Sequence, residues 1–517
     1  MAQDEKTIIR SLSDPNIQID LLQIDDIFTG TSPDSVNGES SGRQYQNHIG
    51  TQFPFITING YVFDSGEIVM MKIDATGFLP QIIFIFELYK SDVFRSQGYP
   101  KDGDIISVFI RAKNDSFKPI RNDYIIKNVD SGRGGIENSG GETVIHGELF
   151  IPHIKDEIIK SYKDTSFNVL KAIADDLDLG FSTNETATND LQTWINGGST
   201  WEDFIKDVCA SSWSDEKSFY KCFIDIYYNL NFINVNNQLD SDGQPAAGIL
   251  DVIGIHDVLI NDGGSVERSQ QSIGKFISNM SNFQGTNMFI PHYQTRNEST
   301  RIHELFGYKY NVQFFDQVSS KYWNIFVDPI VSTGAENTKI ILKGRTFPKN
   351  DDQKNNNGTA PSQQDYWKDQ QKYVWKGVQS KNVHDKYLYA ISHNERNLQE
   401  LKKLYIEADI QRWNPNIYNG EKLPIIIASQ ADKMKASADA IGVDRDTVNS
   451  QEGQAGNPAV LDPFYSGYYM VNGISITYHR DSSHFSPTAP DDKAGSYEPA
   501  FFETVILTRR EWPTPAG

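Results

Sequence analysis

Cysteine is nearly missing from this 517-residue chain, which has only Cys209 and Cys222. Two cysteines are too few for a disulfide framework at this length, so we expect buried free thiols in a protein assembled in a reducing cytoplasm. Long apolar runs are missing as well. The best one, residues 82–86, is too short to cross a bilayer and is typical of a buried strand. The first ten residues, MAQDEKTIIR, contain no apolar stretch, so we expect neither a signal peptide nor a membrane anchor.

Basic charge is also scarce. Against 68 Asp and Glu there are 48 Lys and Arg, which gives a net charge of −20. A nucleic-acid-binding surface needs clustered Lys and Arg to neutralise phosphates, and an anionic membrane attracts the same side chains. The charge argues against both kinds of surface. Two interpretations stay open: the acidic excess keeps the protein soluble, or it lines a surface or lumen that DNA passes without sticking.

Motifs for catalysis and metal binding are missing too. The chain has no HExxH, no GxSxG, no GxxxxGK[ST] and no zinc-type CxxC. Weaker candidates are a His-Glu pair, two histidines five residues apart, a glycine-rich stretch and three acidic pairs. They are His303-Glu304, His479 and His484, residues 131–135, Asp25-Asp26, Asp175-Asp176 and Asp351-Asp352. The glycines lie between predicted strands, and the acidic pairs are typical of solvated faces. We expect no catalytic residue, no cofactor and no metal site.

Aromatic residues, in contrast, are abundant, with 24 Tyr and 29 Phe. Such enrichment favours β-rich domains and large interfaces. Trp194, Trp201 and Trp213 lie within twenty residues of one another. They could form an interface patch, but the core of a small unit is the favoured interpretation.

A β pattern fills residues 51–154, which we predict to be the first barrel. Its strand candidates are separated by Asp-Gly and Gly-Gly turns, which predicts an antiparallel barrel or sandwich. The candidates are residues 69–73, 81–88, 105–111, 124–129 and 143–149, with a hairpin at 131–141.

The period then changes to that of a helix. Residues 166–179 carry one apolar stripe, and Gly180 is predicted as the residue that ends the helix. Thr200 is predicted as the N-cap of a second helix, with Asp203 three residues later. Strand alternation returns in FIDIYYNLNFINV. Residues 155–235 therefore predict a small α+β insertion.

The rest of the chain is less regular. Residues 1–50 are predicted as an N-terminal extension and linker, and 236–390 as a mixed α+β segment with a polar loop at 350–371. Residues 391–517 are predicted as a second barrel with an insertion at 429–458, and with a helix or a strand after a helix at 394–408. Residues 467–478 (GYYMVNGISITY) are predicted as two strands turning at Asn472-Gly473, and residues 501–510 as the last strand. The expected fold is thus β-rich α+β, with two antiparallel β-barrels, the small insertion and long loops.

Three patches resemble one family when they are taken in order. They are residues 161–205, residues 223–235 and residues 466–512, the last ending in Arg509-Arg510-Glu511-Trp512. This order is similar to that of the baseplate hub proteins of contractile tails. The family comprises the hubs of myophages, the late control protein D family and the N-terminal part of type VI secretion spikes.

The resemblance implies a structural protein without enzymatic activity. Each chain would supply two tail-tube-like barrels, and a homotrimer would form a pseudo-six-fold ring between a hexameric tail tube and a trimeric spike. Implied partners are the tail tube or tube-initiator protein and the central spike protein, followed by tape-measure and baseplate wedge proteins. DNA would pass through the lumen without specific binding. The implied location is the tail baseplate of a virion assembled in the host cytoplasm, although the same ring would serve a tailocin or a secretion system.

Two other functions stay open. One is a hub-associated cell-wall hydrolase, which needs a carboxylate pair in a cleft or a zinc site. The other is a carbohydrate-binding adhesion protein, for which the aromatic content is the support.

Overall fold

The computed structural model describes residues 54–63, 66–87, 99–110, 119–133, 141–240, 249–251, 287–289, 292–297, 309–316, 318–327, 371–378, 382–410, 413, 417–427, 465, 467–480 and 500–509. The predicted N-terminal extension (1–50) and the insertion at 429–458 lie outside these residues. The polar loop at 350–371 also does, except for its last residue.

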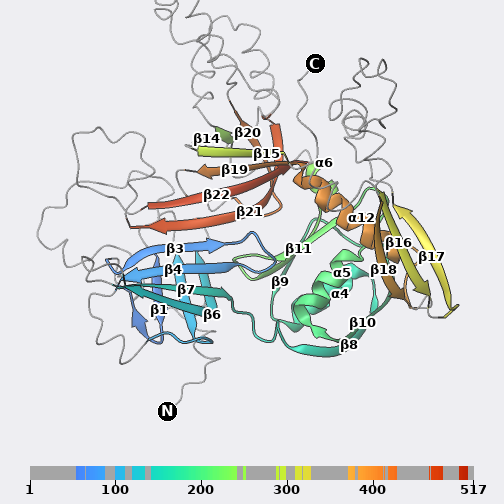
Figure 1. Ribbon diagram of the computed structural model, residues 1–517, viewed down its shortest axis with the longest axis horizontal. Coiled ribbons are helices and arrows are strands. Elements are labelled where there is room, and N and C mark those ends of the chain that lie inside the picture. The colour runs from blue at the N-terminus through green and yellow to red at the C-terminus, as the bar shows by residue number, and fades with distance from the viewer. Residues whose placement is uncertain are drawn as a thin grey trace, which may run out of the picture.

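A large, curled and mostly antiparallel sheet forms the left half of the molecule in Figure 1. Its N-terminal strands follow the order β3-β4-β7-β6-β5-β1-β2. These strands are β1 (Phe55–Ile58), β2 (Tyr61–Val62), β3 (Ile68–Asp74), β4 (Gln81–Glu87), β5 (Ile105–Ile110), β6 (Ile120–Arg133) and β7 (Gly141–Leu149). These bounds confirm the strands predicted within 51–154. Alternate residues such as Ile82, Phe84 and Phe86 enter the core, as a strand with one buried face requires. Arg133 pairs with Gly141, which confirms the hairpin.

The C-terminal strands join the same sheet. β15 (His292–Asn297), β19 (Leu404–Ile410), β22 (Ala500–Arg509) and β21 (Gly467–His479) pair in that order, all antiparallel. On its other edge, β21 meets β20 (Lys422–Ile426), which leads to β13 (Ile249–Asp251) and β14 (Asn287–Phe289).

β21 corrects one prediction. Residues 467–478 do not turn at Asn472-Gly473 but run on as one strand of 13 residues with a register shift between Val471 and Gly473. β22 pairs with both halves of β21, so the chain has no place to reverse. Asn-Gly suits a bulge as well as a turn, and here the extra residue marks a change of partner on the opposite edge. Before the bulge that partner is β20, and after it the partner is β3.

The ladder between β3 and β21 places both β regions in one 14-stranded sheet of the described residues. Its core is continuous from Ile56 through Phe84 to Ile476 and Leu507. The β-rich class that the sequence predicts is confirmed, and the division into two antiparallel barrels stays a prediction.

The α+β unit lies beside this sheet (Figure 1). Its elements are β8 (Glu157–Asp164), α4 (Ser166–Asp176), β9 (Gly180–Thr183), β10 (Gln192–Thr200), α5 (Trp201–Ala210), β11 (Tyr220–Ile224) and β12 (Asn229–Asn234), followed by α6 (Val235–Asp240). β8 and β10 form an antiparallel ribbon, and β11, β12 and β9 form a second small sheet. α4 and α5 pack between the two, each in contact with both.

Local capping decides where α5 begins and where α4 ends. Thr200 caps α5 as predicted, since its Oγ1 accepts from the Asp203 amide at 3.2 Å. Gly180, however, does not end α4. Asp178 takes the left-handed conformation there (φ 55°), and the Leu179 amide bonds back to the Ala174 carbonyl at 2.8 Å. Gly180 instead opens β9, where an added Cβ would lie 2.1 Å from Asn229 Oδ1.

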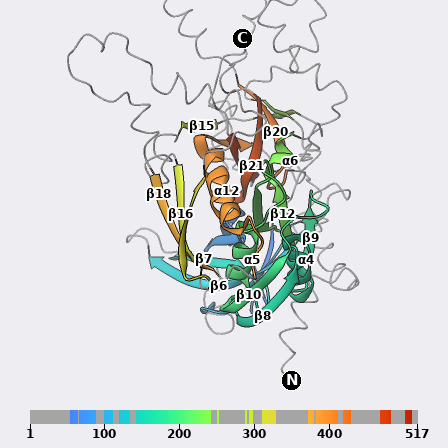
Figure 2. The ribbon, with the colours of Figure 1, turned by 90° about the vertical axis from the view of Figure 1, so that its right-hand side faces the viewer.

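A third group of elements lies at the right of Figure 1. β16 (Lys309–Asp316), β17 (Lys321–Val327) and β18 (Gln371–Val378) form a small sheet. α12 (Tyr387–Glu400) packs against β16, β17, α5 and β11, and it continues through η4 (Leu401–Lys403) into β19. Figure 2 shows α12 beside β16. The predicted helix followed by a strand at 394–408 is confirmed. α12 also spans position 390, where the sequence suggested a domain boundary.

Candidate functional site

The weak candidates for chemistry do not meet at one place in the described residues. His479 lies on β21 between Met70 and Ala500 of the neighbouring strands. His484, His303-Glu304, Asp25-Asp26 and Asp351-Asp352 lie outside the described residues. Over the described part of the chain, no group of three or more His, Cys, Asp or Glu side chains is placed to hold a metal ion.

Asp176 acts as a tie between a helix and a strand. It pairs with Lys160 of β8 and accepts from the Tyr162 hydroxyl at 2.6 Å. Burial alone would raise the pKa of the Asp176 carboxyl, but these two hydrogen bonds outweigh it and lower the pKa. Its neighbour Asp175 is exposed. The Asp176 carboxylate thus joins α4 to β8.

The three tryptophans lie in the core. Trp194, Trp201 and Trp213 are each at most 8% exposed. Trp213 packs edge-on against Tyr389 and His393 of α12. The favoured interpretation is confirmed, because these rings join α5, β10 and α12 inside the chain.

Asp190 is a buried carboxylate in the loop between β9 and β10. It is fully buried and accepts from the amides of Ser166 and Trp213, both at 2.9 Å, and from the Thr188 hydroxyl at 2.7 Å. The Ser166 amide is the first of α4, so Asp190 caps that helix from a distant loop. This contact spans 24 residues, and no local pattern announces it.

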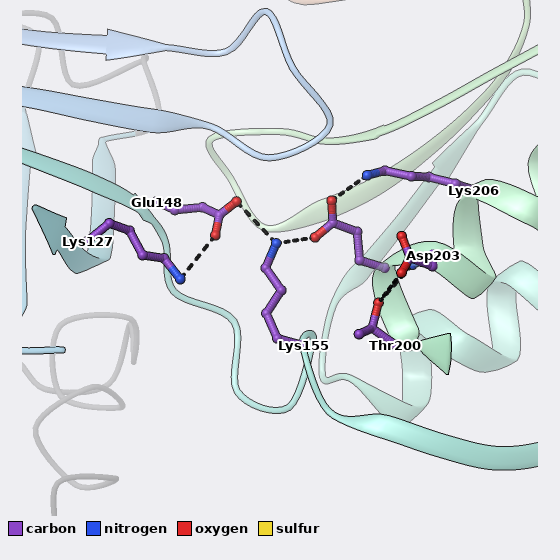
Figure 3. A network of polar contacts seen from close by, with 7 residues as sticks. Lys127, Glu148, Lys155, Thr200, Asp203 and Lys206 are labelled. Atoms are coloured by element: carbon purple, nitrogen blue, oxygen red, sulfur yellow. Dashed lines mark hydrogen bonds and ion pairs between the residues drawn. The ribbon is translucent and has the colours of Figure 1, made fainter. Parts of the chain in front are cut away.

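A chain of charges links the first β region to α5 (Figure 3). Lys127 of β6 pairs with Glu148 of β7 at 3.5 Å, and Glu148 pairs with Lys155 at 3.3 Å. Lys155 also pairs with Glu202 of α5, which pairs in turn with Lys206. Burial tends to raise the pKa of Glu202, but the two lysines lower it. The lysines are nearly half exposed, so each pair contributes at most about 1 kcal/mol.

A second junction surrounds the bulge in β21. Lys221 of β11 donates from Nζ to the Asn472 carbonyl and to Asn472 Oδ1, both at 2.9 Å. Burial lowers the pKa of Lys221 to about 8. The Ala75 amide, just after β3, bonds to the Ile474 carbonyl, and the Gly420 amide bonds to the Val471 carbonyl. The α+β unit and both β regions thus meet at this bulge.

Arg509, the first residue of the RREW ending, lies over the Tyr469 ring with its guanidinium carbon 4.9 Å from the ring centroid. This contact ties β22 to β21 within the chain. Arg510, Glu511 and Trp512 lie outside the described residues.

The outer face of the β8–β10 ribbon differs from all of these places because it exposes aliphatic side chains among polar ones. Ile159 is 89% exposed, Leu191 64% and Ile195 60%. The inner face carries Tyr162 and Trp194, which pack toward the helices. The sequence alone does not predict which face of β8 is exposed. Ile158 and Ile159 are adjacent, and alternation does not say which of them points inward.

The described residues form a β-rich fold whose polar side chains tie its units together and whose β8–β10 ribbon exposes a few aliphatic side chains. None of the helices in the described ranges is both long and apolar enough for a membrane span. Searches found no matching protein-family model and no matching curated protein.

Solved structures similar to the chain are tail proteins and a secretion-system relative of tails. A tail protein from Neisseria meningitidis has 9% identity and a TM-score of 0.43, with 89% of this chain and 97% of that chain covered. A 43 kDa tail protein of prophage MuSo2 from Shewanella oneidensis has 8% identity and a TM-score of 0.44, with 89% and 99% covered. An E. coli type VI secretion component, described as similar to the bacteriophage T4 tail proteins gp27 and gp5, has 8% identity and a TM-score of 0.34, with 89% and 79% covered.

These neighbours belong to the tail and type VI group that the three sequence patches resemble. Identities of 8 to 9% and TM-scores below 0.5 are a distant likeness.

Proposed function

We propose that the chain is the central hub of a contractile-tail baseplate. Three copies would close into a ring that joins a hexameric tail tube to a trimeric spike and lets DNA pass during ejection. The ladder between β3 and β21 supports this best. It joins the two β regions into one sheet, so each chain would offer two tube-like regions as one unit, and three chains would offer six.

The way the polar side chains are used also supports a structural role. Asp190, Lys221 and Glu202 each bond to groups of other elements of the same chain. Such contacts fix the units relative to one another, as a protein that transmits force between a tube and a spike requires. The net charge of −20 would keep a passing genome from sticking to the lumen.

The oligomeric mass tests this proposal. Light scattering on the purified full-length protein should give three times the chain mass of 58.5 kDa, because a closed ring with three-fold symmetry requires three copies. The protein should then bind purified tube and spike proteins of the same tail. A stable monomer that joins neither would contradict the hub.

Two simple assays test the alternatives of a cell-wall hydrolase and a carbohydrate-binding adhesion protein. Clearing of a cell-wall suspension, lost on mutation of one carboxylate, would identify a hydrolase. Binding of the isolated chain to a glycan array would identify an adhesion protein.

A further inference from the structure

We propose that the open edge of β8 binds an extended strand of another protein, and that the exposed aliphatic side chains on the outer face of the ribbon help to hold it. The inference rests on the proposed function only in so far as a baseplate hub needs partners other than its own copies.

The edge itself is the first support. β10 pairs with one edge of β8 from Asp164 to Glu157, and no described strand pairs with the other edge. β10 is better protected, since the Thr193 amide bonds to the Asn382 carbonyl at 3.0 Å. β8 is eight residues long, and long exposed edges recruit further strands unless they are blocked. A β8 edge kept open is therefore a template for an added strand.

The side chains beside this edge point to the same use. Residues 157, 159, 161 and 163 face outward from β8. Ile195 of β10 and Leu191, the residue before β10, are exposed as well. Ile159 stands opposite Gly197, where no side chain shields it, and Ile195 is its diagonal neighbour across the ribbon. Ile159 beside the open edge, with Ile195 next to it, gives an added strand an aliphatic contact.

The small area of the three exposed aliphatic side chains favours a bound strand over the surface of a folded protein. A stable interface between globular partners buries roughly 800 Å² on each side. Three aliphatic side chains can bury only a small part of that area. A single strand draws most of its affinity from main-chain hydrogen bonds and needs only a few apolar contacts. The occupant that fits is therefore an extended segment rather than a second copy of this chain.

The charges at the two ends of the outer face would fix which residue of the added strand lies opposite which residue of β8. Glu157 stands at one end of the outer face and Lys163 at the other. An antiparallel strand, the slightly more stable pairing, would place an acidic residue opposite Lys163 at its N-terminal end and a basic residue opposite Glu157 at its C-terminal end. Between them it would present aliphatic side chains opposite Ser161 and Ile159.

A labelled peptide of this design tests the inference on the full-length protein. The probe is Glu-Thr-Val-Thr-Val-Thr-Lys with a photo-crosslinking group at its N-terminus, and its matched control exchanges the two charged ends. The probe should bind in fluorescence anisotropy, the control should bind less well, and crosslinks should map by mass spectrometry near Lys163. Ile159→Lys should weaken probe binding about tenfold, the loss of one well-buried contact of about 1.4 kcal/mol.

Val318→Lys serves as the comparison variant, because Val318 is an exposed aliphatic residue (49%) in the turn between β16 and β17. It should leave probe binding unchanged. Equal binding of probe and control, crosslinks outside β8, or an Ile159→Lys variant that binds as before would overturn the inference. So would a change of oligomeric mass in Ile159→Lys, which would assign the face to contacts between copies. A wild-type mass other than three chains contradicts the hub instead, so the two failures are distinct.

Discussion

Asp123 is a buried carboxylate on β6 that accepts from the Ser107 hydroxyl of β5. Burial raises its pKa to about 6, and the Ser107 hydrogen bond opposes that rise. Between about pH 4 and pH 6, Asp123 is therefore protonated in the folded chain but ionised in the unfolded chain, where its pKa is 3.8. The stabilisation that this proton gives the folded state is complete below about pH 4 and is lost as the pH rises through 6.

Asp123→Asn should accordingly stabilise the protein at pH 7. The asparagine keeps an oxygen for Ser107 and avoids the buried charge, whose cost is about 3 kcal/mol at 1.36 kcal/mol per pH unit. A gain of about 1–3 kcal/mol is expected, with a flatter pH profile of the urea midpoint between pH 4 and 6. The exposed Asp175→Asn on α4 is the control and should change neither. Equal pH profiles for wild type and Asp123→Asn would show that Asp123 is not the group responsible.

At this scale the sequence predicts what is local. The Thr200 cap could be predicted because its partner, Asp203, is three residues away. The Asp190 cap could not, because Asp190 reaches α4 only after the intervening β9 and its loop have folded back. The prediction that Gly180 ends α4 is wrong for a related reason. Asp178 can take the left-handed conformation too, while Gly180 is needed where Asn229 approaches β9.

At the scale of elements, the bulge of β21 leaves no room for a side chain at Gly473. A Cβ added at Gly473 would lie 2.8 Å from Thr76 Cγ2 and 3.0 Å from Thr76 Cα. The second of these atoms is backbone and cannot turn away. Gly473→Ala should therefore lower stability by about 1–3 kcal/mol through a forced shift of β21 against β3.

Gly197→Ala is the matched control for this prediction. Gly197 also lies in a strand, and an added Cβ there meets nothing within 4 Å. It should be neutral or gain up to about 1 kcal/mol. Thermal melts of both variants decide the matter, and equal midpoints would show that the bulge tolerates a side chain.

The elements predicted well are those whose pattern repeats within one segment. Alternation in residues 81–87 defines β4, since each inward side chain repeats every second residue. Asn472-Gly473 was predicted as a turn because the dipeptide favours both a turn and a bulge. The strands that decide between them, β3 and β22, are not neighbours of that segment in the sequence.

At the scale of the whole molecule, the shared sheet predicts coupled opening. Hydrogen exchange in the Gly473→Ala variant should rise in β3 and β4 as well as in β20 to β22, because these strands belong to one ladder system. The ribbon of β8 and β10 should keep its protection, since it is a separate sheet. A rise confined to β20–β22 would mean that the two β regions open independently.

The order of synthesis gives the β3–β21 ladder a further consequence. Met70 leaves the ribosome long before His479, its partner in the sheet. At 5–20 residues per second, the edge of β3 waits on the order of tens of seconds for β21. During that time the nascent chain carries an open, apolar edge next to a nearly complete N-terminal sheet, which is the kind of surface on which growing chains stick to one another. Yield on overexpression should therefore depend on chaperones that hold the first half of the chain until the last strands are made.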